Sequence, residues 1–452
     1  MRIDQTRPLF AWDCLEDSPS LKTIREFLAA IGDGPLLEGL RNWRGRGRND
    51  YPVHVLWGVV LLTPLLRHTS TDACLAELAR NEGLRRLIGI ESEDKVPKKW
   101  NVSRFMETLG QEPHRSRLTE IFDKIIERLG AAIDDLGQDT AGDSTWLHAR
   151  GKSSEAAVKG EEAEGLPQPA GGRKEYTDDD GQVTRVVEWF GYKLHLLVDV
   201  KHEVVLAYET TSTKAGDGET LPGLLKQAQS NLPPGRIATL AYDKAADNNH
   251  VHRLLAKQNI KPLIQNRSLW KEEHEKMLPG HDGNSNVVYD EAGTLHCYDR
   301  TSEPMVRHQM AYIGHEPARE TLKYRCPARH GGWHCPHDEQ CNAGKVYGKT
   351  VRVKRSIDFR RFPPIPRATK KFERMYKGRT AVERVNARTK LFWGVDDGNI
   401  TGARRFVARV DVVMIVHAGL ALLLASAPRR NGTLGKTRLS AVQKALQSTA
   451  SG

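Results

Sequence analysis

The chain has 452 residues, enough for about two or three domains that each bury a hydrophobic core. Its 68 Lys and Arg residues outnumber its 57 Asp and Glu residues, so the formal net charge is +11, and this excess favours a polyanionic partner such as nucleic acid. Six cysteines are too few for a disulfide scaffold in a chain of this length and indicate a reducing, intracellular compartment.

Neither a secretory signal nor a membrane span is expected. The N-terminal residues, MRIDQTRPLFAWDCLEDSP, are too polar for a signal peptide. The apolar runs at 55–66 and 412–424 are shorter than the roughly 20 residues that cross a bilayer, and His417 interrupts the second run. Both runs are therefore expected to be buried helices, with no membrane partner and a cytoplasmic location.

Residues 1–135 are predicted to form an all-α domain. Apolar residues recur there at spacings of three and four, which is typical of amphipathic helices. The segments with this pattern are 20–31, 52–67, 70–89, 101–109 and 115–129. The basic segment 41–48, RNWRGRGR, combines four arginines with Trp43 and fits a nucleic-acid contact or a solvated loop equally well.

Residues 136–268 predict a mixed α/β domain. Strands are expected at 137–147, 186–200, 204–210, 237–242 and 260–267. A helix is expected after Asp217, which would cap it, and another from Asn248, with Asp247 as the better capping candidate than Asp243. Residues 150–182 are polar and rich in Gly, Pro and Glu, so they are expected to be a flexible insertion. This order of elements predicts an RNase H-like mixed sheet flanked by helices.

Four of the six cysteines lie in the segment 269–370, with several histidines nearby. They are Cys297, Cys326, Cys335 and Cys341. Thiolates and imidazoles are the ligands that tetrahedral Zn²⁺ prefers. The spacing contains no Cys-x2-Cys pair, so a structural zinc site and a set of unligated buried thiols both remain open.

A polar stripe occupies the segment 376–390. Tyr376, Arg379, Glu383 and Lys390 fall within about 60° of one another on an α-helix, and the apolar residues of the segment lie mostly on the other side. Residues 345–379, which lead into this stripe, contain 13 Lys and Arg residues against two acidic ones. Such a stripe is a solvated helix face or part of a functional site.

The spacing Tyr-x2-Arg-x3-Glu-x6-Lys is similar to the signature of the YREK-type DDE transposases of bacterial insertion sequences. The resemblance implies that Glu383 is a catalytic carboxylate and that Tyr376, Arg379 and Lys390 hold DNA phosphates. Asp143 in GDSTWLHA resembles the first catalytic aspartate of that family, with Asp139 as a rival. Asp243 in LAYDKAADN resembles the second, against the simpler interpretation of a capping residue.

In that family Asp143, Asp243 and Glu383 would bind two Mg²⁺ or Mn²⁺ ions, which promote phosphodiester displacement and which prefer hard oxygen ligands. The segment SRFMETLG resembles the end of the helical N-terminal region in related transposases. The resemblance implies that the helical domain, 1–135, binds transposon ends and dimerises. Residues 269–370 would be an inserted β-rich segment, in which Trp270 or Trp333 would stack on a flipped base. Residues 371–427 would complete the catalytic core, followed by a loose basic tail at 428–452.

The function expected from this resemblance is metal-dependent cleavage and strand transfer of double-stranded DNA. The substrates would be terminal inverted repeats and target DNA, bound by a homodimer in the nucleoid. Other hypotheses are an RNase H-like nuclease without strand transfer, a catalytically inactive DNA-binding protein of the same fold, and a zinc-containing structural protein.

Overall fold

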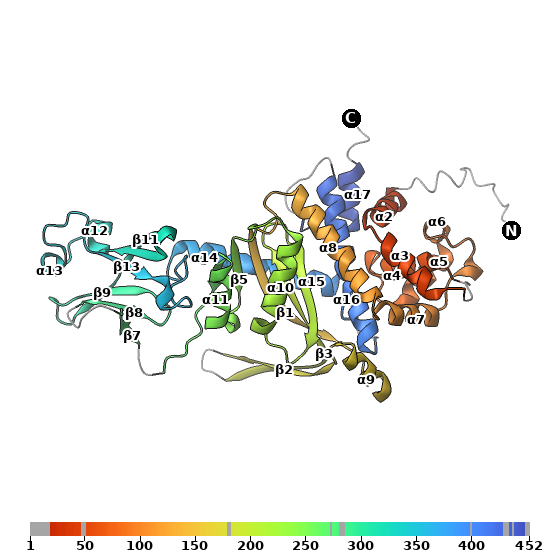
Figure 1. The fold of residues 1–452 in the computed structure, drawn as a ribbon, viewed down its shortest axis with the longest axis horizontal. Helices are drawn as coiled ribbons and strands as arrows, with labels where there is room; N and C mark the ends of the chain where they lie inside the picture. Colours follow the sequence, from red (N-terminus) through yellow and green to blue (C-terminus); the bar gives the residue numbers. More distant parts are fainter. Residues whose placement is uncertain are drawn as a thin grey trace, which may run out of the picture.

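Three regions lie in a row along the long axis of the molecule (Figure 1). The computed structural model describes residues 19–46, 51–178, 182–271, 274–279, 285–397, 400–427, 434–435 and 438–447. Helices of the N-terminal region lie at the right in Figure 1, a mixed sheet lies in the middle, and a β-rich insert lies at the left. The N-terminal 18 residues, on which the prediction about a signal peptide was made, lie outside the described part.

The N-terminal region is helical, as predicted. Its helices are α2 (Pro19–Ala30), α3 (Gly34–Arg44), α4 (Val53–Leu65), α5 (Thr71–Arg80), α6 (Glu82–Leu87), α7 (Lys99–Leu109) and α8 (His114–Ala132), with the 3₁₀ turn η1 (Glu93–Lys95). Nearly every residue of α4 is buried, which explains its uninterrupted apolar sequence. The basic segment around Trp43 is described only to residue 46, and there the indole is 61% exposed.

Helix α16 (Ala403–Ser426) joins the helical region to the rest of the molecule. It packs against α8, α7, α4 and α2, and also against β4 of the central sheet. A single hydrophobic cluster therefore runs through both regions. The helix is long and apolar enough to cross a membrane, but 89% of its most apolar window is buried inside the protein. The run 412–424 is thus part of a buried helix, as expected, although this helix is longer than the run itself.

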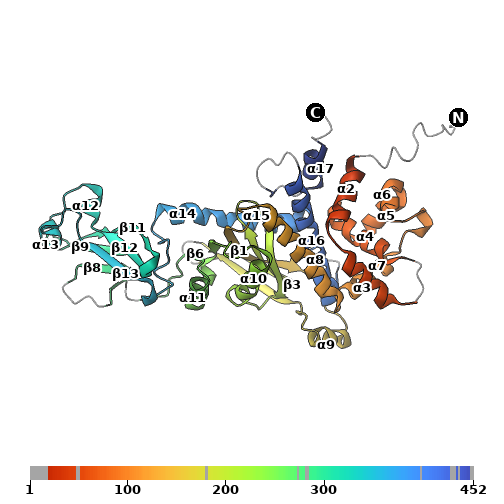
Figure 2. The same ribbon diagram turned by 45° about the horizontal axis from the view of Figure 1, so that its top comes forward.

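The central sheet contains β1 (Asp139–His148), β2 (Ala170–Thr177), β3 (Val183–Asp199), β4 (Val205–Ser212), β5 (Thr239–Tyr242) and β6 (Lys261–Ile264). Strand β3 runs antiparallel to β1, β2 and β4, whereas β5 is parallel to both β1 and β6. The order β4-β3-β1-β5-β6 is that of an RNase H-like sheet. Figure 2 shows helices α10 (Asp217–Asn231) and α11 (Asn249–Lys257) on one side of the sheet, and α14 (Lys370–Tyr376) and α15 (Thr380–Leu391) on the other.

Residues 150–182 are not simply a flexible insertion. The described part contains α9 (Glu155–Ala163) and β2, which pairs with the first half of β3. Glu161 is fully buried and accepts hydrogen bonds from Ser153 Oγ, Gln168 Nε2 and the backbone N–H of Ala403. A polar composition therefore does not prevent order here, because one buried carboxylate holds the segment to the start of α16.

The segment 269–370 is β-rich and has its own hydrophobic core, which includes Leu295, Leu322, Val353 and Phe362. Its strands β10 (Val306–Gln309), β9 (Leu295–Asp299), β8 (Val287–Asp290) and β7 (Glu275–Met277) form one antiparallel sheet. Strands β11 (Ala311–Glu316), β12 (Thr321–Arg325) and β13 (Thr350–Lys354) form another. The short helices α12 (Pro327–Gly331) and α13 (Asp338–Asn342) lie between β12 and β13, and 3₁₀ turns occur at Pro317–Arg319 and Arg355–Ile357.

The tail after residue 427 is not loose where it is described. Helix α17 (Leu439–Gln447) packs against α2 and α16, and Val442 is fully buried there. The apolar residues of this short amphipathic helix supply the contact that holds it.

A buried ion cluster attaches the insert to the central domain. Asp247 does not cap α11; Asn248 does so, accepting a hydrogen bond from the backbone N–H of Val251. Asp247 is fully buried and lies 2.8 Å from the guanidinium groups of both Arg360 and Arg367, which belong to the end of the insert. Two guanidinium groups thus depend on one carboxylate for charge compensation.

We expect Asp247→Ala to lower the free energy of unfolding by about 3–5 kcal/mol, because two cations would remain buried without their counter-charge. Urea denaturation of the purified protein measures the change. Asp72→Ala is the matched control, since Asp72 forms an exposed ion pair with Lys99 and its loss should matter little. Equal effects of the two substitutions would contradict the anchoring role of Asp247.

Candidate active site

Asp143 and Asp243 lie side by side on adjacent parallel strands. The register pairs Asp139 with Thr239 and Ala141 with Ala241, so the same alignment continued by two residues places Asp143 opposite Asp243. Adjacent strands are about 4.8 Å apart, which brings the two carboxylates into one site. Asp243 follows β5 directly and keeps an extended backbone. Gly142 of β1 packs against the buried ring of Tyr242 of β5. A Cβ at position 142 would overlap that ring, so glycine allows the two strands to pack closely here.

Asp139, the rival candidate, lies at the other end of β1. Its exposed side chain accepts a hydrogen bond of 2.6 Å from Thr239 Oγ1. That position is four residues along the strand from Asp143, or about 13 Å. The structure therefore groups Asp143, rather than Asp139, with Asp243.

The third carboxylate, on α15, is joined to Asp143 through an arginine. Glu383 accepts a hydrogen bond from Arg379, whose guanidinium also lies 3.7 Å from Asp143. Tyr376 stacks on Phe372 and is hydrogen-bonded to Arg379, and burial raises its pKa, with the nearby Asp243 carboxylate acting in the same direction. Four of the predicted residues therefore lie near the Arg379 guanidinium. They are Asp143, Asp243, Glu383 and Tyr376.

The polar stripe is not on one continuous α-helix. Helix α14 ends at Tyr376, the 3₁₀ turn η5 (Lys377–Arg379) follows, and α15 begins at Thr380. Gly378 in this turn faces Val200, where a Cβ would be too close to the valine side chain. The turn lets the chain approach the sheet, so that Arg379 reaches Asp143.

Lys390 lies at the edge of this group. Its ammonium is 3.6 Å from the ring centroid of Trp146, three residues beyond Asp143 on β1, and 3.5 Å from the carboxylate of Asp396. Burial lowers its pKa, and the Asp396 carboxylate opposes that shift. The structure therefore places Lys390 beside the site, with protein partners of its own.

A family model described as "Transposase DDE domain" matches residues 140–418, which is more than half of the chain. The chain belongs to the DDE transposase family. A second model, "Transposase domain (DUF772)", matches residues 13–108 of the helical region. A solved structure of the piggyBac transposase synaptic complex with hairpin DNA is similar with a TM-score of 0.38 and 10% identity, covering 96% of this chain and 82% of that one. No curated protein matches the sequence.

The electrostatics of the transposase site favour a bound cation. Burial raises the pKa of Asp143 to about 6, and the charges of Asp217 and Asp243 act in the same direction, while the Arg379 guanidinium and a backbone hydrogen bond only partly offset them. Negative charge is therefore in excess at this point of the transposase. Asp143, Asp243 and Glu383 supply hard oxygen ligands of the kind that Mg²⁺ prefers, so the residues present fit the metal that DDE chemistry uses.

In the described residues no three or more His, Cys, Asp or Glu side chains are already spaced to hold an ion. At this site the reason is visible, because Arg379 occupies the space between Asp143 and Glu383. Divalent ions held by the three carboxylates would activate the attacking oxygen and stabilise the leaving oxygen at a phosphodiester. Arg379 would then be free to contact a DNA phosphate, for which a guanidinium is well suited.

One ionic group next to the transposase site was not predicted. Asp217 does not cap α10, whose N-cap is Gly216, but lies 2.7 Å from Lys193 Nζ and 3.3 Å from His195 Nδ1. Although burial acts to raise its pKa, hydrogen bonds from His195 and Lys193 hold that pKa below the usual range. The signal in the sequence was the pair of polar residues at alternate positions, 193 and 195, of the mainly apolar second half of β3.

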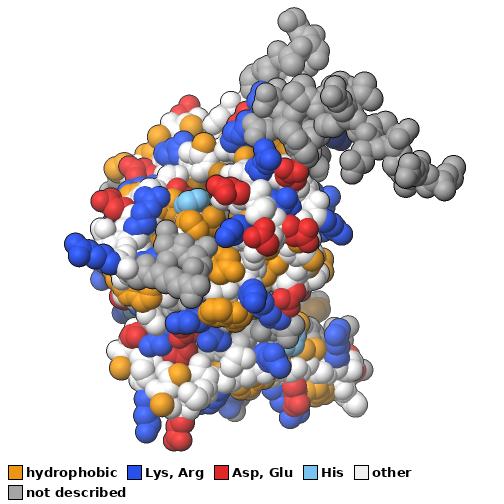
Figure 3. All heavy atoms as spheres, turned by 90° about the vertical axis from the view of Figure 1, so that its right-hand side faces the viewer, with side chains coloured by type: hydrophobic (Ala, Val, Ile, Leu, Met, Phe, Trp, Pro, Cys, Tyr) orange, Lys and Arg blue, Asp and Glu red, His pale blue; other side chains and the backbone are white. Residues whose placement is uncertain are grey.

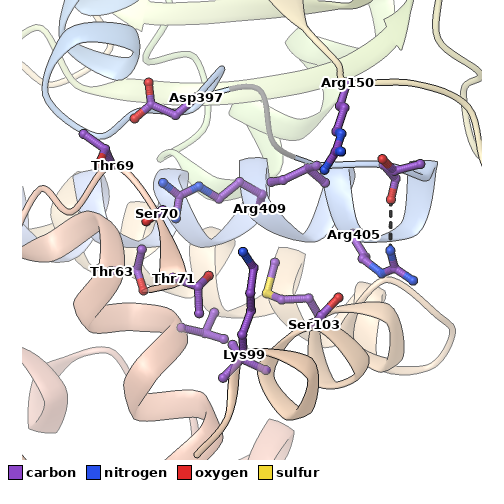
Figure 4. Close-up of a pocket in the computed structure, with 15 residues that line it drawn as sticks. Thr63, Thr69, Ser70, Thr71, Lys99, Ser103, Arg150, Asp397, Arg405 and Arg409 are labelled. Atoms are coloured by element: carbon purple, nitrogen blue, oxygen red, sulfur yellow. Dashed lines mark hydrogen bonds between the residues drawn. The ribbon is translucent and has the colours of Figure 1, made fainter. Parts of the chain in front are cut away.

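A separate cavity of about 310 Å³ lies between the helical region and α16 (Figure 4). Lys99, Arg150, Arg405 and Arg409 line it together with Asp397. Arg409 donates hydrogen bonds to the carbonyl oxygens of Trp393 and Gly394, and Arg405 donates one to that of Thr401. Arg405 and Arg409 thus hold the chain after α15 against α16. Asp143, Asp243 and Glu383 do not line this cavity.

The pKa of Asp143 predicts how its charge affects stability. Below pH 3.8, the ordinary pKa, the carboxyl is protonated in both the folded and the unfolded state. As the pH rises through about 6 the folded protein must ionise this buried carboxyl, so the free energy of unfolding falls. Without metal, Asp143→Asn should therefore raise the free energy of unfolding by about 2 kcal/mol near neutral pH and by little near pH 4. Urea denaturation in EDTA tests this, with Asp139→Asn as control. A destabilised Asn variant at neutral pH would contradict the assignment.

Proposed function

We propose that this transposase binds the terminal inverted repeats of its own insertion sequence, cleaves the DNA at their ends and joins the freed 3′-hydroxyls to target DNA. In cleavage the oxygen of water attacks phosphorus and the 3′-oxygen leaves. In strand transfer the 3′-hydroxyl attacks a target phosphodiester in the same way. Membership of the DDE family supports transposase chemistry in general.

The observation that carries the proposal is the link from Glu383 through Arg379 to Asp143, which lies opposite Asp243 in the strand register. Asp143 and Asp243 come from neighbouring parallel strands, and Glu383 comes from a helix that packs on β1. Glu383 is 48% exposed, as on a solvated helix face, but Arg379 is only 22% exposed and lies between Glu383 and Asp143. Acidic side chains held on rigid elements suit a two-metal phosphoryl-transfer site.

The DNA-binding roles in the proposal belong to Arg379, Tyr376 and Lys390, together with the helical region. Figure 3 shows the end of the molecule that this region forms, where basic side chains are mixed with acidic and apolar ones. Trp43 and Trp100 are exposed there, 61% and 56% respectively, and Arg104 lies over the Trp100 ring. Such a mixed surface suits contacts with DNA and with a second copy of the chain, so the proposal includes a homodimer on DNA in the nucleoid.

Glu383→Gln keeps the shape of the side chain but removes its charge. We expect strand cleavage to fall by orders of magnitude, whereas binding to the element's ends should remain nearly unchanged, because affinity comes mainly from phosphate contacts. Cleavage of a labelled end fragment with Mg²⁺ or Mn²⁺ measures the first property and a mobility-shift assay the second. Full cleavage by the Gln variant, or cleavage by the wild-type protein without metal, would mean that a contaminating nuclease cuts the DNA. That outcome would favour the alternative of a catalytically inactive DNA-binding protein of this fold.

Arg379→Ala and Lys390→Ala test the phosphate contacts. Each lost contact should weaken end binding and lower the slope of log affinity against log salt concentration by about one unit. Arg384→Ala is the matched control, because Arg384 lies on α15, as Lys390 does, but forms an ion pair of 2.6 Å with Glu203. Fluorescence anisotropy over a salt series gives the slopes. If the Arg379 and Arg384 variants behave alike, Arg379 does not bind phosphate.

A further inference from the structure

Four cysteines from separate parts of the β-rich insert line one small cavity. Cys297 lies on β9, Cys326 follows β12, Cys335 lies in the loop after α12, and Cys341 is on α13. We propose that these four side chains bind one structural Zn²⁺ ion, which cross-links the segment 326–349 to the sheet that contains β9. The proposal concerns the insert alone and does not depend on the catalytic function.

The segment 326–349 has little else to hold it together. Its elements are two helices of five residues each, joined by irregular chain. Within this described segment, Ala328 is the one apolar side chain buried beyond the cysteines, while Trp333, Val346 and Tyr347 are exposed. The hydrophobic core of the insert contains no residue from 327–349. Segments with so small a core usually need a disulfide or a metal ion for a defined structure.

The polar groups around the thiols suit thiolate ligands. The amide of Asn286 donates a hydrogen bond of 3.3 Å to Cys341 Sγ, and that of Asn342 donates one of 3.4 Å to Cys326 Sγ. Lys349 donates to the side-chain oxygen of Asn286 at 2.9 Å and so orients its amide. Hydrogen bonds of this kind from surrounding residues are a regular feature of protein metal sites, where they fix the ligands.

The four thiols are close enough to interact. Cys297, Cys326, Cys335 and Cys341 all line the same small cavity, together with Asn286 and Asn342. The sulfurs have not converged to ligation distance, since no set of three donors in the described chain is already spaced to hold an ion. Closing the site requires rotation of the cysteine side chains around a cavity that they already share.

The chemistry of the donors selects zinc. Four thiolates form the closed tetrahedral set typical of structural Zn²⁺, whereas Mg²⁺ and Ca²⁺ require oxygen ligands. The nearby imidazoles have other partners. His296 lies 3.3 Å from Asp290, His308 packs against the Trp333 ring, and His337 contacts Thr301 Oγ1 at 3.3 Å.

The test begins with the wild-type full chain, purified with a reducing agent and dialysed without added metal. Elemental analysis should find about one zinc per chain, and titration with a mercurial reagent should release it in step with thiol modification. Protein prepared with cobalt should show the absorption of a tetrahedral cobalt–thiolate site. Absence of zinc together with loss of free thiols would establish a disulfide in its place and overturn the proposal. Absence of zinc with all thiols free would also overturn it.

Variants then locate the ion. Cys335→Ser should lose most of the zinc and become sensitive to proteolysis within 326–349, whereas Cys74→Ser, which changes a buried thiol of α5, should keep it. The double variant Asp143→Asn/Glu383→Gln should also keep the zinc while losing DNA cleavage. Zinc lost from that double variant would place the ion at the catalytic carboxylates and overturn the proposal. If Cys335→Ser does not fold, the cobalt spectrum of the wild-type protein still decides.

Discussion

The parallel pairing of β1 with β5 is the constraint on which the site depends. Residues 100 positions apart lie opposite each other in this register, and the two aspartates follow the same alignment. A slip of one residue would turn one of the two side chains to the other face of the sheet, because alternate residues of a strand face opposite sides. Gly142 and the buried Tyr242 ring pack together at this point, so the register that aligns the carboxylates is also one of close packing.

The regions outside the sheet are attached to it by different kinds of contact. Helix α16 joins the helical region to the sheet through a continuous hydrophobic cluster, and this arrangement resists relative motion of the two parts. The β-rich insert has a core of its own and is held by polar contacts that include the Asp247 cluster. Such an insert is attached at a few buried ion pairs, while the helical region and sheet form one packed body.

The charge balance of the site changes with its occupant. In the protein alone, Arg379 neutralises part of the charge of Asp143 and Glu383. Burial is the main cause of the raised pKa of Asp143, and the charges of Asp217 and Asp243 add to it, so the ionised form is disfavoured in the protein alone. Arg379 is thus a counter-charge in the protein alone, and under the proposed function bound cations would release it to contact a DNA phosphate.

Much of the fold followed from local patterns. The helical region and the chain order of strands and helices in the α/β domain were predicted, because apolar periodicity is a property of neighbouring residues, whereas the candidate carboxylates came from the resemblance to a family motif. Placing α14 and α15 on one continuous helix was wrong, since the 3₁₀ turn Lys377–Arg379 separates them, and Gly378 of that turn packs closely against Val200. The order within 150–182 was also missed, because it depends on the buried Glu161 and its distant partner Ala403.

The sequence by itself determined which residue types are available for the chemistry: one aspartate within a predicted strand and one directly after another strand, a glutamate within a helical stripe, and cysteines in an insert. Only the tertiary structure decided which of them meet. It separated Asp139 from Asp143, assigned Asp217 to Lys193 and His195, and placed Arg379 between two carboxylates. These outcomes depend on contacts between residues tens to hundreds of positions apart, whose free energies arise from packing and burial that no local pattern records.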